Sequence, residues 1–198
     1  IQQDPERFDV AVSAPIIQAL VARGDIGALV PAPNDREQSI PVLEEAFAAG
    51  IPVLTVDTFI GDGDYANGEV TFPLSYIGSD NTQGGYIACS ALADALGAGA
   101  KIYIQNVRPG ISTTDQREDG CEAAGADRGL EVVRVDYNDN SADTAQQQTA
   151  AVLQANPDIA GMFATNTFGA LGAGAAIENA GLSGAVQVAL FDASEENI

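Results

Sequence analysis

The chain has 198 residues, of which 28 are acidic and 8 are Lys or Arg, giving a formal net charge of −20. This charge excludes a nucleic-acid or anionic-membrane partner, because both require a basic surface. Histidine is absent, which excludes Ser-His-Asp and Cys-His catalysis and any His-ligated metal site. We find no signal peptide, no apolar run long enough to span a membrane and no initiating Met, and we interpret the sequence as a mature or trimmed fragment.

Seven apolar segments are predicted to be strands, and most are continuous apolar runs rather than alternating ones. Such runs are typical of strands that are covered on both faces, as in parallel sheets. In chain order the predicted strands are residues 26–32, 51–57, 75–78, 101–106, 130–137, 159–165 and 186–192.

Amphipathic segments alternate with these strands, and the alternation predicts an α/β fold of doubly wound parallel sheets. The connection 58–81 has no helical period, which favours a functional loop or a change of domain. We therefore predict a first lobe over residues 1–79 and a second over 80–198. The predicted helices are residues 9–23, 39–49, 81–96, 114–128, 142–155 and 168–180.

Polar side chains follow the carboxyl ends of the predicted strands, where open α/β sheets bind their ligands. Each one singly is more often a helix cap or a loop residue. Together they offer carboxylates, amides, hydroxyls, cations and aromatic faces, which suit a neutral polyhydroxylated molecule. They are Asn34, Asp35, Asp57, Thr58, Ser79, Asp80, Asn81, Arg108, the turn 113–117, Tyr137, Asn138, Asn166 and Asp192.

Arg117 lies near the start of the helix that follows the Pro109-Gly110 turn. A cation is unfavourable there, because the helix dipole already places partial positive charge at that end. Arg117 therefore either points into a cleft and binds a polar ligand, or pairs with Asp115 or Asp119. The loop alone leaves these two interpretations open.

The two cysteines, Cys89 and Cys121, lie about two turns into the helices that flank the strand 101–106. Helices placed in this way can bring their early turns within the Cα separation of a disulfide. We predict a disulfide; two packed thiols are the alternative.

Other motifs give no site. The spacing of Asp62, Asp64 and Asn67 misses a calcium loop by one residue, and no dinucleotide or phosphate loop occurs. Asp57 ends a strand like a phosphatase nucleophile, but Phe59 stands where such enzymes need a second aspartate. We predict no cofactor and no metal site.

Five motifs in family order resemble the sugar-binding proteins of bacterial ABC transporters, which have the type I periplasmic-binding fold typified by ribose-binding protein. They are AGIPVLTVD (49–57), YIGSDNTQGGYIA (76–88), PGISTTDQREDG (109–120), PDIAGMFATNTFGALGAGAAIENAG (157–181) and VALFDAS (188–194).

The resemblance implies two lobes that close on a sugar or polyol at a hinge. It implies that Asp57, Arg117, Asn166 and Asp192 bind hydroxyls or the ring oxygen, and that Tyr137 covers a sugar face. The remaining candidates, near the crossover or lining the pocket, are Thr58, Ser79, Arg108, Thr113 and Phe191.

The resemblance also implies a monomeric, non-enzymatic, extracytoplasmic receptor, periplasmic or anchored at the cell surface, that delivers its ligand to a membrane permease. Against the family pattern, an opening strand and helix are missing before Ile1 and return segments are missing after Ile198, so both lobes are expected to be incomplete. Thr58 stands where some relatives place arginine, and the insertion 58–75 is longer than in ribose-binding protein. The alternatives are the effector domain of a lactose-repressor-type regulator and an enzyme that shares the fold.

Overall fold

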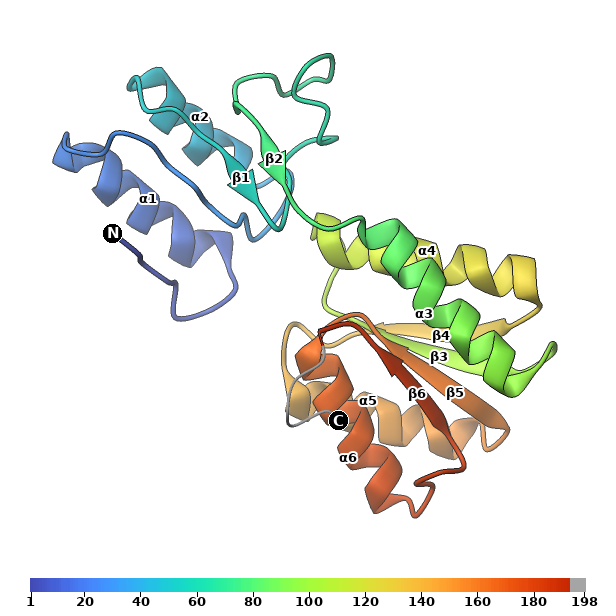
Figure 1. Ribbon diagram of the computed structural model, residues 1–198. Coiled ribbons are helices and arrows are strands. Elements are labelled where there is room, and N and C mark those ends of the chain that lie inside the picture. The colour runs from blue at the N-terminus through green and yellow to red at the C-terminus, as the bar shows by residue number, and fades with distance from the viewer. Residues whose placement is uncertain (193–198) are drawn as a thin grey trace. The chain divides into compact units, whose positions relative to one another are not determined.

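The computed structural model describes residues 1–192, which divide into two compact units (Figure 1). Unit 1 comprises Ile1–Ser79 with Gly110–Thr113, and unit 2 comprises Asp80–Pro109 with the chain from Thr114 onward. Residues 110–113 had been predicted in the second lobe. They group with unit 1 because Arg36 N donates to Gly110 O at 2.8 Å and Phe59 N donates to Ser112 Oγ at 3.0 Å.

Unit 2 is built around a four-stranded parallel sheet in the order β4-β3-β5-β6. Its helices and strands all lie within two residues of the predicted bounds. They are α3 (Asn81–Leu96), β3 (Lys101–Asn106), α4 (Ser112–Arg128, whose first two residues belong to unit 1), β4 (Glu131–Tyr137), α5 (Ala142–Ala155), β5 (Ile159–Ala164), α6 (Thr167–Asn179) and β6 (Gln187–Leu190).

Helices α3 and α4 cover one face of this sheet, and α5 and α6 cover the other (Figure 1). In β3, Ile102 and Ile104 pack with residues of α3 and α4, whereas Tyr103 packs with residues of α5 and α6. This coverage of both faces explains why the strand segments are continuous apolar runs in the sequence.

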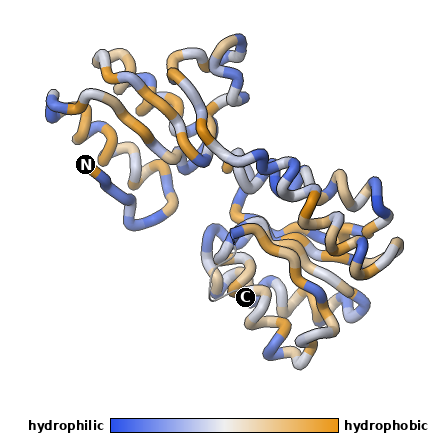
Figure 2. Tube along the Cα trace, in the orientation of Figure 1, coloured by the Kyte–Doolittle hydropathy of each residue, from blue (hydrophilic) through white to orange (hydrophobic). Residues whose placement is uncertain are grey.

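Unit 1 contains α1 (Val10–Arg23), α2 (Ile40–Ala48) and a parallel pair of short strands, β1 (Thr55–Val56) and β2 (Tyr76–Ile77). Both helices contribute to one core around Leu29, Leu43 and Val53. The segment before α1 is mainly hydrophilic, as Figure 2 shows.

The predicted strand 26–32 is wrong, and the predicted strand 51–57 is much too long. Residues 26–32 contain only one isolated bridge, Leu29 to Val53, although Val56 N also donates to Pro31 O at 3.0 Å. Leu54 N and Val56 N donate to Leu29 O and Pro31 O, but Pro31 has no N–H group to donate the next ladder bond, so the pairing does not continue as a regular strand.

Among residues 1–192, no helix combines the length and the apolar character that a membrane crossing requires.

Candidate functional site

The candidate site of unit 2 lies at the edge where its four parallel strands end, which we call the carboxyl edge. Polar or aromatic residues lie at or directly beyond the end of every strand there. They are Asn106 for β3, Tyr137 and Asn138 for β4, Thr165 and Asn166 for β5, and Phe191 and Asp192 for β6.

A buried arginine connects three of the elements at this edge. Arg117 Nε donates to Asn81 Oδ1 at 2.9 Å, and its Nη1 donates to Thr165 O at 2.8 Å and to Asp192 Oδ2 at 3.3 Å. Its guanidinium carbon lies 3.8 Å from the centre of the Phe191 ring, a cation–π contact. The structure therefore brings together four residues selected in the sequence, Asn81, Arg117, Phe191 and Asp192, and adds Thr165.

Asn166 caps the N-terminus of α6 and also contacts a strained turn. Its Oδ1 accepts from Gly169 N at 3.0 Å, and its Nδ2 donates to Asn140 Oδ1 at 2.7 Å. Asn140 has φ 61°, in the left-handed region, and its N donates to Asn138 Oδ1 at 2.9 Å. Asn140 was not among the predicted site residues. The run Asn-Asp-Asn after a strand could have indicated this turn, because Asn and Asp tolerate the left-handed conformation best.

A buried amide network lies behind Asn138. Asn138 Nδ2 donates to Gln105 Oε1 at 2.8 Å, and Gln105 Nε2 donates to Gln148 Oε1 at 3.0 Å and to Tyr103 Oη at 2.5 Å. Gln105 is fully buried, and it too was missed. Gln105 is a polar residue inside the apolar run 101–106. A buried amide requires hydrogen-bond partners, so this position could have indicated a buried polar network.

Tyr137 lies in a second cluster, around Glu118. Asn106 Nδ2 donates a short hydrogen bond to one carboxylate oxygen of Glu118, and Tyr137 Oη donates to the other at 3.4 Å. Burial is the main cause that raises the pKa of Glu118, and the charges of Glu122 and Asp115 raise it further. Burial and then the charge of Glu118 raise the pKa of Tyr137.

Glu118→Gln is expected to raise the thermal unfolding temperature at pH 7. An acid whose pKa is raised on folding destabilises the folded state once it ionises, and this cost is absent below its ordinary pKa of 4.5. The gain should therefore shrink as the pH falls to about 4. Thermal melts at both pH values check this, with Glu178→Gln at the far end of α6 as control; a lower unfolding temperature at pH 7 would contradict it.

Arg108 lies beside the strained turn that follows β4. Its Nη1 lies 3.8 Å from Asp139 Oδ1, and Asp139 adjoins Asn140 in the strained turn. Arg108 therefore lies on the same edge, beside the part of the site that holds Asn166.

Unit 1 carries four of the residues that the family resemblance placed at the sugar site. Asp57 is exposed just beyond β1, with φ 61°, and its backbone O accepts from Tyr76 Oη at 2.7 Å. Thr58 is buried, and its Oγ1 donates to Asp57 Oδ2 at 3.4 Å. Ser79 is exposed at the end of the first segment of unit 1, and Thr113 is buried.

Within the described residues, no group of three or more Cys, Asp or Glu side chains could hold a metal ion. The side chains at the carboxyl edge instead form a mixed set of carboxylates, amides, a guanidinium and aromatic rings. Such a set can make paired hydrogen bonds and cover an apolar face, and it lies where doubly wound α/β proteins bind small molecules.

The family is shown by comparison with known proteins. A family model described as "Periplasmic binding protein domain" matches residues 1–198, and the chain belongs to this family.

Relatives of known function are ribose-binding proteins. The chain is 33% identical over 165 residues to the ribose import binding protein RbsB of Bacillus subtilis, covering 83% of this chain and 51% of that protein. It is 28% identical over 190 residues to the D-ribose/D-allose-binding protein of Pseudomonas aeruginosa, covering 94% of this chain and 58% of that protein. The chain thus spans between half and two thirds of the length of these relatives.

Solved structures agree on the fold. An ABC transporter solute-binding protein from Agrobacterium vitis, bound with α-D-tagatopyranose, matches with a TM-score of 0.92 and 45% identity over 96% of this chain and 64% of its own. One from Actinobacillus succinogenes with bound D-allose matches with a TM-score of 0.82 and 31% identity over 94% of this chain and 65% of its own. The predicted fold class and family are confirmed.

Proposed function

We propose that this protein is an extracytoplasmic solute-binding protein that captures a sugar or polyol and delivers it to the permease of an ABC transporter. Its family and the sugars bound to its structural neighbours support this function. In this proposal it acts as a monomeric receptor and not as an enzyme.

The observation that carries the proposal is the exposed carboxylate of Asp192, which contacts the same guanidinium group as the Phe191 ring. The side chain of Asp192 is 48% exposed and is held by Arg117. A carboxylate accepts two sugar hydroxyls, and an aromatic ring covers the C–H face of a sugar. The acidic side chains of this edge, Asp192 and Glu118, favour an uncharged ligand over an anionic one.

The other predicted site residues complete the proposed sugar contacts. Asn166 offers an amide at the same edge, where Tyr137 and Arg108 of unit 2 also lie. In unit 1, Asp57 offers an exposed carboxylate, and the remaining proposed contacts there are Thr58, Ser79 and Thr113.

The disulfide between Cys89 and Cys121 supports an extracytoplasmic location, because disulfides persist in oxidising compartments. The alternative of a lactose-repressor-type effector domain shares the fold. No observation favours it, and the net charge of −20 is unfavourable for a protein that must lie near DNA.

Isothermal titration calorimetry with D-tagatose, D-ribose and D-allose tests the proposal, and saturable binding of one sugar per chain is the expected result. Asp192→Asn should weaken that binding by about tenfold to a hundredfold, because it removes charge from a hydrogen-bonded contact. Glu178→Gln should not change it, since Glu178 lies at the opposite end of α6 from Asn166. An affinity of Asp192→Asn equal to that of the wild type would contradict the site.

A further inference from the structure

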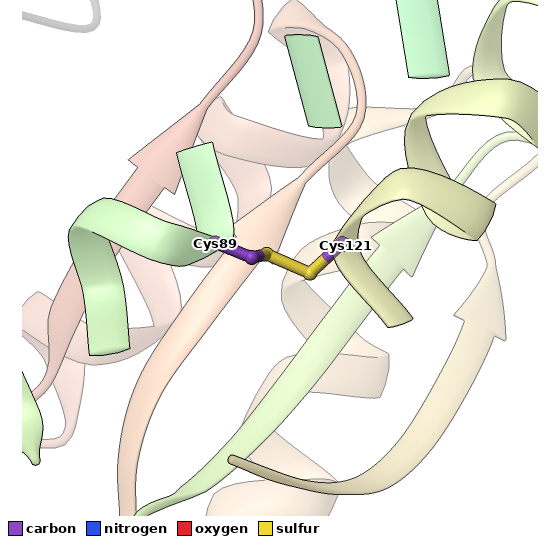
Figure 3. Close-up of a disulfide and its surroundings, with 2 residues drawn as sticks. All are labelled: Cys89 and Cys121. Atoms are coloured by element: carbon purple, nitrogen blue, oxygen red, sulfur yellow. A yellow bond between two sulfur atoms is a disulfide. The ribbon is translucent and has the colours of Figure 1, made fainter. Parts of the chain in front are cut away.

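Gln105 is a polar residue that the apolar strand β3 encloses completely. It is fully buried, and β3 lies between β4 and β5 in the sheet. On the other face of β3, Ile104 packs in one core with the Cys89–Cys121 disulfide, which joins α3 and α4 (Figure 3). Gln105 is therefore carried by a strand that is packed on both faces, directly behind the carboxyl edge.

The amide of Gln105 has one favourable orientation. Gln148 Nε2 donates to Tyr137 O at 2.9 Å, and because a backbone carbonyl only accepts, Gln148 must turn its Oε1 toward Gln105. Gln105 Nε2 donates to that oxygen at 3.0 Å and to Tyr103 Oη at 2.5 Å, so Gln105 Oε1 faces Asn138. Rotating the amide would place the oxygens of Gln105 and Gln148 against each other.

The orientation of Gln105 in turn fixes that of Asn138. Asn138 Nδ2 donates to Gln105 Oε1 at 2.8 Å, so Asn138 Oδ1 points the other way and accepts from Asn140 N at 2.9 Å. A backbone N–H only donates, so this end of the chain of amides requires the same orientation as the Tyr137 end. Two backbone groups thus determine the direction of every amide between them.

The turn that Asn138 holds is strained, and it orients Asn166. Asp139 has φ 56° and Asn140 has φ 61°, so two successive residues with a Cβ adopt the unfavourable left-handed conformation. Asn140 Oδ1 accepts from Asn166 Nδ2 at 2.7 Å, while Gly169 N donates to Asn166 Oδ1 at 3.0 Å. Because an amide nitrogen carries two hydrogens in one plane, the position of Asn140 sets the direction of the second hydrogen of Asn166.

We propose that Gln105 and Asn138 are positioning residues of the sugar site: they do not touch the sugar and act by fixing the turn that orients the Asn166 amide. Both residues are fully buried. The inference rests on the proposed function, in which Asn166 contacts the sugar. It gives the buried amide network a role in ligand affinity in addition to its role in stability.

Gln105→Leu removes the amide and keeps a side chain of similar size. Binding of the sugar identified by calorimetry should weaken by about threefold to tenfold, the amount expected when one neutral hydrogen bond is misdirected. Tyr103→Phe is the matched control, because it removes another partner of Gln105 but leaves the bond from Asn138 to Gln105 in place. Its affinity should change by less than about twofold.

Thermal melts of the two variants separate stability from affinity. Both should unfold at a lower temperature than the wild type, because each leaves a buried polar group with one partner fewer. Only Gln105→Leu should bind the sugar more weakly. Wild-type affinity in Gln105→Leu, or an equal loss of affinity in both variants, would overturn the proposal.

Asn138→Ala makes the same test from the outer end of the network if Gln105→Leu does not fold. It removes the side chain that links Gln105 to Asn140, so the same threefold to tenfold loss of affinity is expected. An unchanged affinity in this variant would overturn the proposal.

Hydrogen exchange of the ligand-free protein gives a readout that does not depend on any sugar. In Gln105→Leu, the backbone amide of Asn140 should exchange at least about fivefold faster, because Asn138 Oδ1 is no longer held against it. The amide of Asn138 donates to Asn106 O at 2.9 Å and should keep its rate, which provides an internal control. Unchanged exchange of Asn140 would overturn the positioning role, whereas faster exchange in a protein that binds none of the sugars would count against the proposed function alone.

Discussion

Replacing Cys89 and Cys121 together by alanine is expected to lower the free energy of unfolding by about 3–4 kcal/mol. The disulfide closes a loop between residues 32 positions apart, and a cross-link of this span restricts the unfolded chain by about that amount. Both cysteines are fully buried in the core that α3 and α4 form with the sheet, so the bridge also fixes two packed helices. The unfolding temperature should fall by roughly 10 °C.

Urea and thermal denaturation with and without reductant measure this effect. Reductant should destabilise the wild-type protein and leave the double alanine variant unchanged, which separates loss of the bridge from loss of side-chain volume. Thiol titration of unfolded, unreduced wild-type protein should find no free thiol. Two reactive thiols there would show that the cysteines are only packed together.

The sequence predicted unit 2 closely because each of its elements carries an unambiguous local pattern. Its central strands β3 and β5 are mainly apolar on both faces. Polar caps start its helices: Ser141 Oγ accepts from Thr144 N, and Asn166 Oδ1 accepts from Gly169 N. Unit 1 was predicted less well, because Pro31 and Pro52 interrupt segments whose apolar content alone suggests regular strands.

The residue types at the carboxyl edge were predictable, but their directions were not. A polar residue after a parallel strand must lie at that edge, so Asn166 and Asp192 could be placed there from their position in the sequence. Whether Arg117 faces a ligand or the protein depends on its distance from Asn81 and Thr165. Those residues lie 36 and 48 positions away in the chain, and their distances from Arg117 depend on how α4 packs against α3 and against the end of β5.

Gly120→Ala is expected to destabilise the protein by about 3 kcal/mol, at the upper end of the range for an overpacked core. The added Cβ would lie 2.0 Å from Thr82 O and 2.8 Å from Tyr86 N, and because both are backbone atoms, neither can move without shifting α3. The usual gain of up to about 1 kcal/mol when alanine replaces glycine inside a helix is too small to compensate.

Gly125→Ala in the same helix is the matched control, because its added Cβ would meet nothing closer than 3.6 Å. It should leave stability unchanged or raise it by about 0.5–1 kcal/mol. Chemical denaturation of the two variants under identical conditions measures the difference. Equal stability would show that α3 and α4 can separate at little cost where Gly120 meets Thr82.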